Sequence, residues 1–328
     1  MNIPIEYIDM ILSFKKSQVI NTFLKLEIAD ILEVAGMNIY ELSLKLNVDE
    51  YKLKRVIRAF IWCELVYNEN ETIYLTYKGK MFCSSNNDGI NEWLYSQLNI
   101  HYKVWGELST ALKDNIIVFK EMFKENFFEY SNNSKKFGNY FQTNMSNNSL
   151  LISKSLLEKY NMSNIKSIID IGGGDGTLLL EILKMYPNIN GTVFEKDNVK
   201  KLINNNVKNS NCQLILGDFF QVIPENFDIY ILKLILHDWD DEYAKKILKN
   251  CRKSMNSNSK MLIIEHILPD DLTTDPFYIS MDIAMMLLFN GKERTLKEYD
   301  TILKESNLKI NNVIDLGDDC NLIEVIPV

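Results

Sequence analysis

A run of glycines beside an acid is the segment whose residue types most clearly suit ligand binding. Residues 170–176 read Asp-Ile-Gly-Gly-Gly-Asp-Gly and follow a short β-rich run. Glycines are needed where a chain turns sharply and a ligand must approach the backbone closely. A dinucleotide fingerprint, G-x-G-x-x-G, would place its third glycine at position 177, where this chain has Thr. The segment instead carries Asp170 two residues before Gly172, with further glycines at Gly174 and Gly176.

The acid suits a cationic ligand. A dinucleotide brings a pyrophosphate to a helix N-terminus, where the helix dipole favours anions. S-adenosylmethionine has no phosphate, and its ammonium and sulfonium groups favour nearby carboxylates such as Asp170. Glu195 closes the next β-rich run, where an acid can bind both ribose hydroxyls, and Asp218 follows the third run, within reach of an adenine amino group. The order of these acids predicts an S-adenosylmethionine site; the alternative is a tight turn with two unrelated surface acids.

A histidine follows the fourth β-rich run. Residues 232–241 read Leu-Lys-Leu-Ile-Leu-His-Asp-Trp-Asp-Asp and contain His237, one of only three histidines in the chain. Ligand chemistry in open α/β sheets gathers at the carboxyl ends of the strands, and a neutral histidine can accept a proton from an acidic hydroxyl. The spacing by itself slightly favours a second interpretation, in which Asp238 or Asp240 caps a helix and His237 only packs.

Alternating strands and helices predict the scaffold for these residues. From Ser167 onward, β-rich runs alternate with helical stretches, which indicates a parallel sheet with helices on both faces. The expected strands are 167–171, 191–195, 212–216, 228–233 and 260–266, and the expected helices are 177–185, 198–205 and 242–255. The runs 309–316 and 321–327 predict a final hairpin that adds an antiparallel strand. Polar stretches at 131–134 and 144–149 suggest the passage between two domains.

The first hundred residues have mainly helical periodicity. An apolar face from Phe23 to Leu32 predicts a helix that ends near Gly36. Segments 39–46 and 51–62 look like a helix-turn-helix, and 66–68 with 72–75 look like a two-stranded wing. The second helix is basic, which raises the possibility of DNA binding. Between residues 36 and 80, however, seven Lys/Arg face six Asp/Glu, and this near balance favours a packing and dimerisation unit.

Composition narrows the function classes. Of 328 residues, 46% are apolar and 24% charged, as in ordinary globular proteins, and the formal net charge is −8, which disfavours nucleic acid as the main partner. The five cysteines form no zinc-binding or disulfide pattern. Glu6 and Asp9 stand where a signal peptide needs apolar residues, and no apolar run reaches membrane-spanning length. We expect a soluble, cytoplasmic protein that makes no membrane contact.

Three motifs together resemble one enzyme family. Residues 232–241, Ile-Glu-His-Ile-Leu-Pro at 264–269 and Gly-Lys-Glu-Arg-Thr at 291–295 are similar to the small-molecule O-methyltransferases, which include caffeic acid and acetylserotonin O-methyltransferases and bacterial natural-product enzymes. The resemblance implies an α/β fold, with a C-terminal Rossmann-like class I methyltransferase sheet and a mostly helical, winged-helix-like dimerisation domain. The implied division is a dimerisation domain at 1–100, a helical linker that contributes to the acceptor pocket at 101–150 and the catalytic domain at 151–328, in a homodimer.

The resemblance also implies roles for individual residues. His237 would be the general base, oriented by Glu265 and Glu293, and no metal would take part. Gly172 and Gly174 would line the methionine part of the cofactor. The other residues expected to bind S-adenosylmethionine or its product S-adenosylhomocysteine are Asp170, Glu195, Asp218, Phe219, Lys233 and Trp239.

A small aromatic acceptor is implied as the substrate. Phe137, Phe141 and Met145 recur every four residues on one helix face, a pattern that by itself is more typical of a core. The resemblance places these three in the acceptor wall, opposite Met285, with Asp238 shaping the site beside the base. The segment before Gly291 is shorter than the corresponding loop of plant members, so no acceptor contact is expected from it. The chain is also somewhat short for a plant member of the family, which suits a bacterial enzyme.

The function expected is transfer of a methyl group to a phenolic hydroxyl. The alternatives are a family member that methylates nitrogen or has lost methyl transfer, and a DNA-binding regulator that senses a small ligand. A nicotinamide-dependent dehydrogenase is disfavoured by Thr177.

Overall fold

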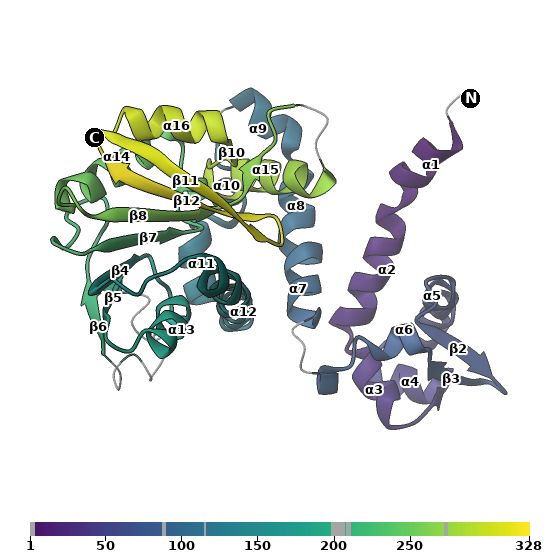
Figure 1. Ribbon diagram of the computed structural model, residues 1–328. Coiled ribbons are helices and arrows are strands. Elements are labelled where there is room, and N and C mark those ends of the chain that lie inside the picture. The colour runs from purple at the N-terminus through teal and green to yellow at the C-terminus, as the bar shows by residue number, and fades with distance from the viewer. Residues whose placement is uncertain (1–3, 87–89, 115, 198–206, 208–210, 272–274) are drawn as a thin grey trace. The chain divides into compact units, whose positions relative to one another are not determined.

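The computed structural model describes residues 4–86, 90–114, 116–197, 207, 211–271 and 275–328. The chain divides into two compact units, Met1–Lys103 and Val104–Val328, each with its own hydrophobic core (Figure 1). The helix predicted at 198–205 lies outside the described residues. Among the described residues, no helix combines the length and the apolar character needed to cross a membrane.

The first unit consists of helices around a small antiparallel sheet in the order β1-β3-β2. Its helices are α1 (Ile5–Leu12), α2 (Phe14–Lys25), α3 (Ile28–Val34), α4 (Ile39–Leu46), α5 (Glu50–Trp62), α6 (Tyr77–Lys80) and α7 (Ile90–Ser96). A π-helical turn (Gln97–His101) and α8 (Tyr102–Trp105) follow. The strands are β1 (Met37–Asn38), β2 (Val66–Glu69) and β3 (Thr72–Leu75).

Local side-chain chemistry explains the helix-turn-helix. A capping box between Asn38 and Glu41 begins α4, and Asn47 ends it in the left-handed conformation. Asp49 then accepts a hydrogen bond from the Lys52 amide and begins α5. The predicted pair of helices and the β2–β3 hairpin are both present. The apolar face predicted as one helix is instead split into α2 and α3, because Glu27 takes a left-handed conformation between them.

The second unit is built on a seven-stranded sheet in the order β11-β12-β8-β7-β4-β5-β6. Its strands are β4 (Ser167–Ile171), β5 (Asn190–Glu195), β6 (Cys212–Leu216), β7 (Ile229–Lys233), β8 (Lys260–Glu265), β11 (Leu308–Gly317) and β12 (Cys320–Pro327). The five strands β4 to β8 are parallel, whereas β12 runs antiparallel to β8 and to β11. The predicted doubly wound sheet with a C-terminal hairpin is therefore confirmed, nearly to the residue.

Helices cover both faces of this sheet. Figure 1 shows α12 and α13 on one face and α14 and α16 on the other, and apolar side chains of each pair belong to the core on that face. The helices are α9 (Leu108–Asp114), α10 (Val118–Phe123), α11 (Phe127–Asn133), α12 (Lys135–Lys159), α13 (Thr177–Met185), α14 (Asp241–Ser254), α15 (Pro276–Phe289) and α16 (Leu296–Lys304). Two short parallel strands, β9 (Ile267–Leu268) and β10 (Arg294–Thr295), tie the end of β8 to the start of α16.

The polar stretches at 131–134 and 144–149 belong to helices of the second unit. Ser134 caps α12, which runs unbroken through residue 150, and the hydroxyl of Ser149 donates to a carbonyl one turn earlier in that helix. These polar residues mark a helix cap and a helix surface, whereas the two compact units divide at residue 103.

Candidate active site

The glycine segment forms a tight loop between β4 and α13. Gly172, Gly174 and Gly176 have φ angles of 69°, 58° and 84°, a region that side-chain-bearing residues rarely adopt. A Cβ atom on Gly172 would lie 2.5 Å from the Ile235 side chain, whereas one on Gly174 would meet nothing within 4 Å. The loop is thus closely packed at its start and open at Gly174, where a ligand can approach the backbone.

Two buried carboxylates border this loop. Glu195, at the end of β5, accepts hydrogen bonds from the Gly174 amide at 3.1 Å and the Lys196 amide at 2.7 Å. Asp170 is 2% exposed, and its Oδ2 atom has no hydrogen-bond partner among the residues that the structure describes. Burial raises the pKa of Asp170 to about 7; the positive charge of Lys233 opposes this rise, and the negative charge of Glu195 adds to it. Burial also raises the pKa of Glu195. Buried carboxylates with spare acceptor capacity fit a ligand that brings hydroxyls and positive charge.

The remaining predicted cofactor residues lie at the ends of neighbouring strands. Asp218 follows β6, and its Oδ1 accepts a hydrogen bond from the Phe220 amide at 2.8 Å. The rings of Phe219 and Trp239 meet edge to face at 6.2 Å, and within the described part of the chain the buried indole N–H of Trp239 has no hydrogen-bond partner. Lys233, at the end of β7, donates to Asn148 of α12 at 3.2 Å. The sheet therefore brings these side chains to the same edge as the glycine loop.

His237 sits in a turn of 3-10 helix (Leu236–Asp238) just beyond β7. Its Nδ1 atom lies 2.9 Å from Oε1 of Glu293 and 3.6 Å from Oε2 of Glu265, while Nε2 lies 3.5 Å from Oδ1 of Asp238. The imidazole is 7% exposed. One ring nitrogen is thus held by the carboxylates of Glu293 and Glu265, and the other lies beside Asp238.

Charge around the imidazole controls its protonation. Burial would lower the pKa of His237, but the charges of Glu265 and Asp238 and the hydrogen bond to Glu293 outweigh it and raise the pKa to about 10. Burial raises the pKa of Glu265. Burial also raises the pKa of Asp238 to about 7, although the positive charge of His237 opposes this rise. The group is therefore able to take up a proton and hold it strongly.

The two glutamates come from different elements. Glu265 ends β8, and its Oε1 accepts hydrogen bonds from the amides of Ile235 at 3.0 Å and Leu236 at 2.8 Å. Glu293 is anchored through its own amide, which donates to Asp282 of α15 at 3.0 Å. Asp282 was not among the predicted site residues, because nothing in the sequence links α15 to the segment after it.

His237, Glu265 and Glu293 also have the residue types of a metal site. One ligand atom from each lies within 4.8 Å of the others. Their hydrogen bonds to one another and to the amides of the turn already give each side chain a role without a cation. The expectation that no metal takes part stays a prediction.

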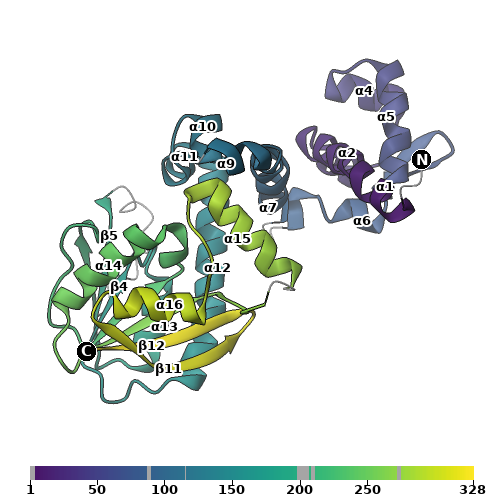
Figure 2. The ribbon, with the colours of Figure 1, turned by 90° about the horizontal axis from the view of Figure 1, so that it is seen from above.

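Aromatic side chains of α11, α12 and α15 form a cluster, and Figure 2 shows the ribbons of these three helices. We use the name aromatic cluster for Phe127, Phe128, Phe137, Phe141 and Phe289, whose ring centroids lie 4.8 to 6.4 Å apart in the contacts among them. The side chain of Phe137 is 1% exposed and packs inside the cluster, whereas that of Phe141 is half-buried. Three of the five rings were not predicted, because Phe127, Phe128 and Phe289 share no helical period with the other two.

The methionines predicted for the acceptor wall lie on the same two helices. Met145 is half-buried on α12, next to Ser146, whose hydroxyl donates to Asp175 of the glycine loop at 2.6 Å. Met285 is buried on α15, which contacts the turn that carries His237. The second unit therefore joins the glycine loop, the histidine turn and the aromatic cluster through α12 and α15.

A family model described as an O-methyltransferase domain matches residues 105–308. The chain belongs to this family. The prediction of an S-adenosylmethionine-dependent small-molecule O-methyltransferase is therefore confirmed at the level of the family, and the match spans every site residue described above.

Relatives and solved structures agree with this assignment. The phenazine O-methyltransferase of Lysobacter antibioticus is 27% identical over 98% of this chain and 95% of its own. A cephaeline 6'-O-methyltransferase of Carapichea ipecacuanha is 31% identical over 96% of this chain and 93% of its own. The O-methyltransferase of neocarzinostatin biosynthesis, solved with S-adenosylmethionine and 2-hydroxy-5-methyl naphthoic acid, superposes with a TM-score of 0.82 at 22% identity over 95% of this chain and 96% of that one. The enzyme thus shares its fold over nearly its whole length.

Proposed function

We propose that this O-methyltransferase methylates a phenolic hydroxyl of a small, flat aromatic metabolite, with His237 as the general base. The observation that carries the proposal is the 2.9 Å contact between Nδ1 of His237 and Glu293. Because the carboxylate accepts the Nδ1 proton, the lone pair of the neutral ring lies on Nε2, which is the atom that must face the acceptor. A phenol has an ordinary pKa of about 10, close to that of this imidazole, so proton transfer between them is nearly balanced.

The buried acids beside the glycine loop provide the proposed cofactor site. Glu195 would hold the ribose hydroxyls, Asp170 the positive charge of the methionine part, and Asp218 the adenine amino group. Phe219 and Trp239 would enclose the adenine, and the indole N–H of Trp239, which has no partner among the described residues, would be available to an acceptor nitrogen of the cofactor. Bound S-adenosylmethionine supplies a methyl group attached to a sulfonium, which is a good leaving group without metal assistance.

The protein's own contribution to the reaction is positioning and one proton transfer. His237 takes the hydroxyl proton on Nε2, and Glu265 with Glu293 stabilises the imidazolium that forms. A positioned base contributes about 10²–10⁴-fold, and alignment of the acceptor oxygen with the methyl carbon contributes most of the remainder. The half-buried Phe141 and the methionines Met145 and Met285 offer apolar and polarisable surface, which suits a flat acceptor.

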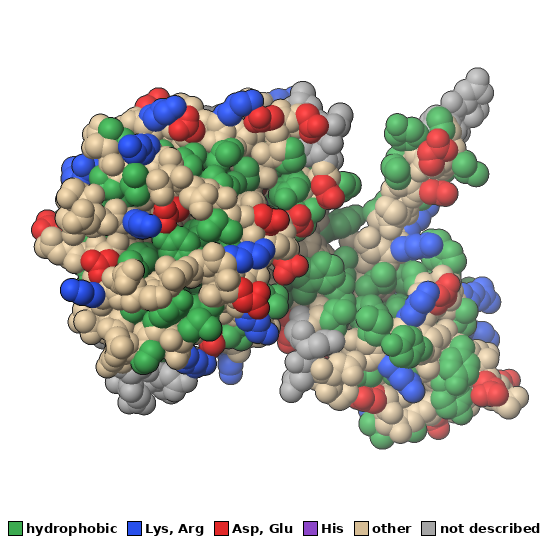
Figure 3. Space-filling view, in the orientation of Figure 1, with side chains coloured by type: hydrophobic (Ala, Val, Ile, Leu, Met, Phe, Trp, Pro, Cys, Tyr) green, Lys and Arg blue, Asp and Glu red, His purple; other side chains and the backbone are tan. Residues whose placement is uncertain are grey.

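Dimerisation is proposed for the first unit. The helix α1 buries none of its residues, and Ile5, Met10 and Ile11 are 74%, 68% and 64% exposed (Figure 3). An apolar helix of this kind is typical of an interface rather than of a solvated surface. We expect sedimentation equilibrium to give a dimer, and a charged pair of substitutions, Met10→Glu with Ile11→Lys, to give a monomer; a wild-type monomer would contradict the proposal.

The base assignment is tested with a matched pair of histidine variants. His237→Asn keeps a donor toward Glu293 but has no atom in the place of Nε2, so we expect unchanged binding of S-adenosylhomocysteine and a loss of turnover of about 10²-fold or more. His266→Asn is the control, because His266 uses Nδ1 only to contact the Asp319 carbonyl at 2.8 Å. Full turnover by His237→Asn, assayed by transfer of a labelled methyl group, would contradict the assignment.

A further inference from the structure

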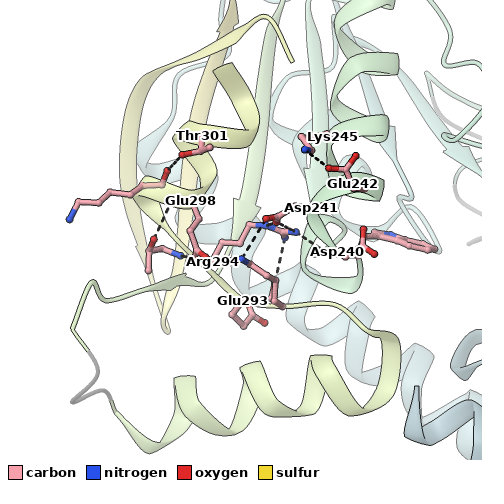
Figure 4. Close-up of polar contacts among 12 residues, drawn as sticks. Asp240, Asp241, Glu242, Lys245, Glu293, Arg294, Glu298 and Thr301 are labelled. Carbon is pink, nitrogen blue, oxygen red and sulfur yellow. Dashed lines mark hydrogen bonds and ion pairs between the residues drawn. The ribbon is translucent and has the colours of Figure 1, made fainter. Parts of the chain in front are cut away.

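The largest side chain that the structure buries completely is that of Arg294, which is 0% exposed. Arginine is almost never fully buried unless its charge and donors are satisfied. Nε and Nη2 both lie 2.9 Å from Oδ1 of Asp241. Nη1 donates to the carbonyl of Leu236 at 2.8 Å and approaches that of Lys292 at 3.4 Å, and Nη2 donates to the carbonyl of Trp239 at 2.8 Å (Figure 4). Every nitrogen of the guanidinium therefore has an oxygen acceptor within hydrogen-bond distance, and the side chain connects Asp241 to the backbone of two other segments.

The carbonyls that Arg294 binds stand on either side of the catalytic histidine. Leu236 precedes His237, and Trp239 follows it by two residues, so one planar group holds both ends of the turn. The segment that carries Arg294 supports the middle of the turn as well, because the Lys292 amide donates to the His237 carbonyl at 2.9 Å. Arg294 thus acts on the turn from the same segment that supplies Glu293 to the imidazole.

The opposite side of the turn is held by an acid. Glu265 accepts hydrogen bonds from the amides of Ile235 and Leu236, while Arg294 donates to the carbonyls of Leu236 and Trp239. The turn is therefore fixed by a buried anion at its donors and a buried cation at its acceptors. Charge-assisted hydrogen bonds of this kind are shorter and stronger than neutral ones, and the fork of Arg cannot be reproduced by Lys.

We propose that Arg294, with Asp241 as its counter-ion, is a positioning residue that fixes the turn carrying His237 and Trp239. The inference rests on the proposed function, since it requires His237 to be the base. Trp239 packs against Phe219 and Phe220 at ring distances of 6.2 and 4.7 Å, so the same guanidinium sets the base against the acceptor and the indole against the cofactor. We call the contacts of Arg294 with Asp241 and with the carbonyls of the turn the clamp. Loosening the clamp lowers the rate of the chemical step more than it weakens cofactor binding.

The clamp is tested with two matched pairs of variants. Asp241→Ala removes the counter-ion, and its control is Glu242→Ala, which removes the next acid of the same helix turn, whose carboxylate pairs with Lys245. Arg294→Lys keeps the positive charge but removes the planar set of guanidinium donors. Its control is Arg252→Lys, since Arg252 also binds backbone carbonyls, at Asn307 and Val328. The quantity measured is kcat per molecule that binds S-adenosylhomocysteine, so loss of folded protein does not count as loss of rate.

We expect Arg294→Lys to lower this kcat by about 10²-fold and Asp241→Ala by about tenfold, since misplacement by about 1 Å has costs of this order. The affinity for S-adenosylhomocysteine should fall by a smaller factor, and both controls should keep the wild-type kcat. A lower melting temperature with unchanged kcat per binding site would show a purely structural role and overturn the proposal. If Arg294→Lys does not fold, the comparison of Asp241→Ala with Glu242→Ala decides the matter alone.

A double-mutant cycle separates this proposal from the base assignment. If Arg294 and Asp241 act through His237, adding Asp241→Ala to His237→Asn lowers the residual kcat by much less than its factor in the wild type. The full factor in both backgrounds would overturn the positioning role while leaving His237 as the base. Full turnover by His237→Asn alone would instead remove the base assignment, and the positioning role would fall with it.

Discussion

The Nδ1 atom of His237 lies 2.9 Å from Oε1 of Glu293, although 56 residues separate the two in the chain. The carboxylate fixes which nitrogen carries the proton and stabilises the charged ring. Burial alone would make His237 a weaker base, so its high pKa is set by the carboxylates around it. The basicity of the proposed catalytic group is therefore a property of its neighbours.

This relationship predicts the pH dependence of the enzyme. A general base must be unprotonated in the free enzyme, so kcat/KM should rise with pH until it passes the pKa of His237, about 10. Glu293→Gln removes one negative charge and weakens the hydrogen bond to the charged ring, which should move the rise about one to two pH units lower. The measurement is the pH profile of kcat/KM for both proteins with one phenolic acceptor. An acceptor that ionises by itself would give the same profile in both, and that result would contradict the assignment.

Glu195 should control cofactor affinity. Its carboxylate is held by the amides of Gly174 and Lys196 at the end of β5, where it can accept hydrogen bonds from two ribose hydroxyls. Glu195→Gln keeps the shape but loses the charge, and hydrogen bonds to charged groups contribute about 1.5–3 kcal/mol, so we expect affinity for S-adenosylhomocysteine to fall about tenfold or more. Isothermal titration calorimetry measures this directly. Glu181→Gln, whose side chain is half-buried and pairs with the exposed Lys184 on α13, is the control and should bind normally.

Two phenylalanines one helical turn apart should behave differently. Phe141 is half-buried, whereas Phe137 is enclosed by the aromatic cluster. Phe141→Ala should raise the acceptor KM with little change in melting temperature, because it removes contact surface for the acceptor. Phe137→Ala should mainly destabilise the fold, by about 3–5 kcal/mol as for other buried phenylalanines. Steady-state kinetics and thermal unfolding of both variants test the distinction, and equal acceptor KM values for Phe141→Ala and the wild type would remove Phe141 from the acceptor site.

Gly291 should be essential for reasons of space. A Cβ atom there would lie 2.0 Å from the His237 carbonyl and 2.6 Å from the Asp238 carbonyl carbon, both of them backbone atoms. Gly291→Ala should therefore push the segment 291–294 away from the turn and lower turnover by about 10²-fold or more. Gly317→Ala, at the end of β11 and outside the site, meets no neighbour within 4 Å and is the comparison for activity, although its φ of 83° adds backbone strain. Wild-type turnover by Gly291→Ala would show that the two segments are not held as closely as the structure indicates.

Much of the fold follows from the sequence because short-range chemistry decides it. The runs that became β4 to β8 are apolar and β-branched over five or six residues, which suits strands buried on both faces. Capping residues such as Asn38 and Asp49 fix where helices begin regardless of what lies around them. The glycines of the loop after β4 are needed for its backbone conformation, so their spacing could be interpreted before any contact was known.

The arrangement of charges was decided by the tertiary structure. Asp282, Arg294 and the rings of Phe127 and Phe289 acquire their roles from contacts between segments far apart in the chain, and no local period relates them. Arg294 is part of the Gly-Lys-Glu-Arg-Thr motif at 291–295, but the sequence predicts a role only for the neighbouring Glu293. A buried guanidinium cannot be distinguished from an exposed one in sequence. The sequence by itself predicts which residues bind the cofactor and which accepts a proton. Only the folded chain decided which of them share a proton and which hold the catalytic turn, because burial and the distances between charges exist only in three dimensions.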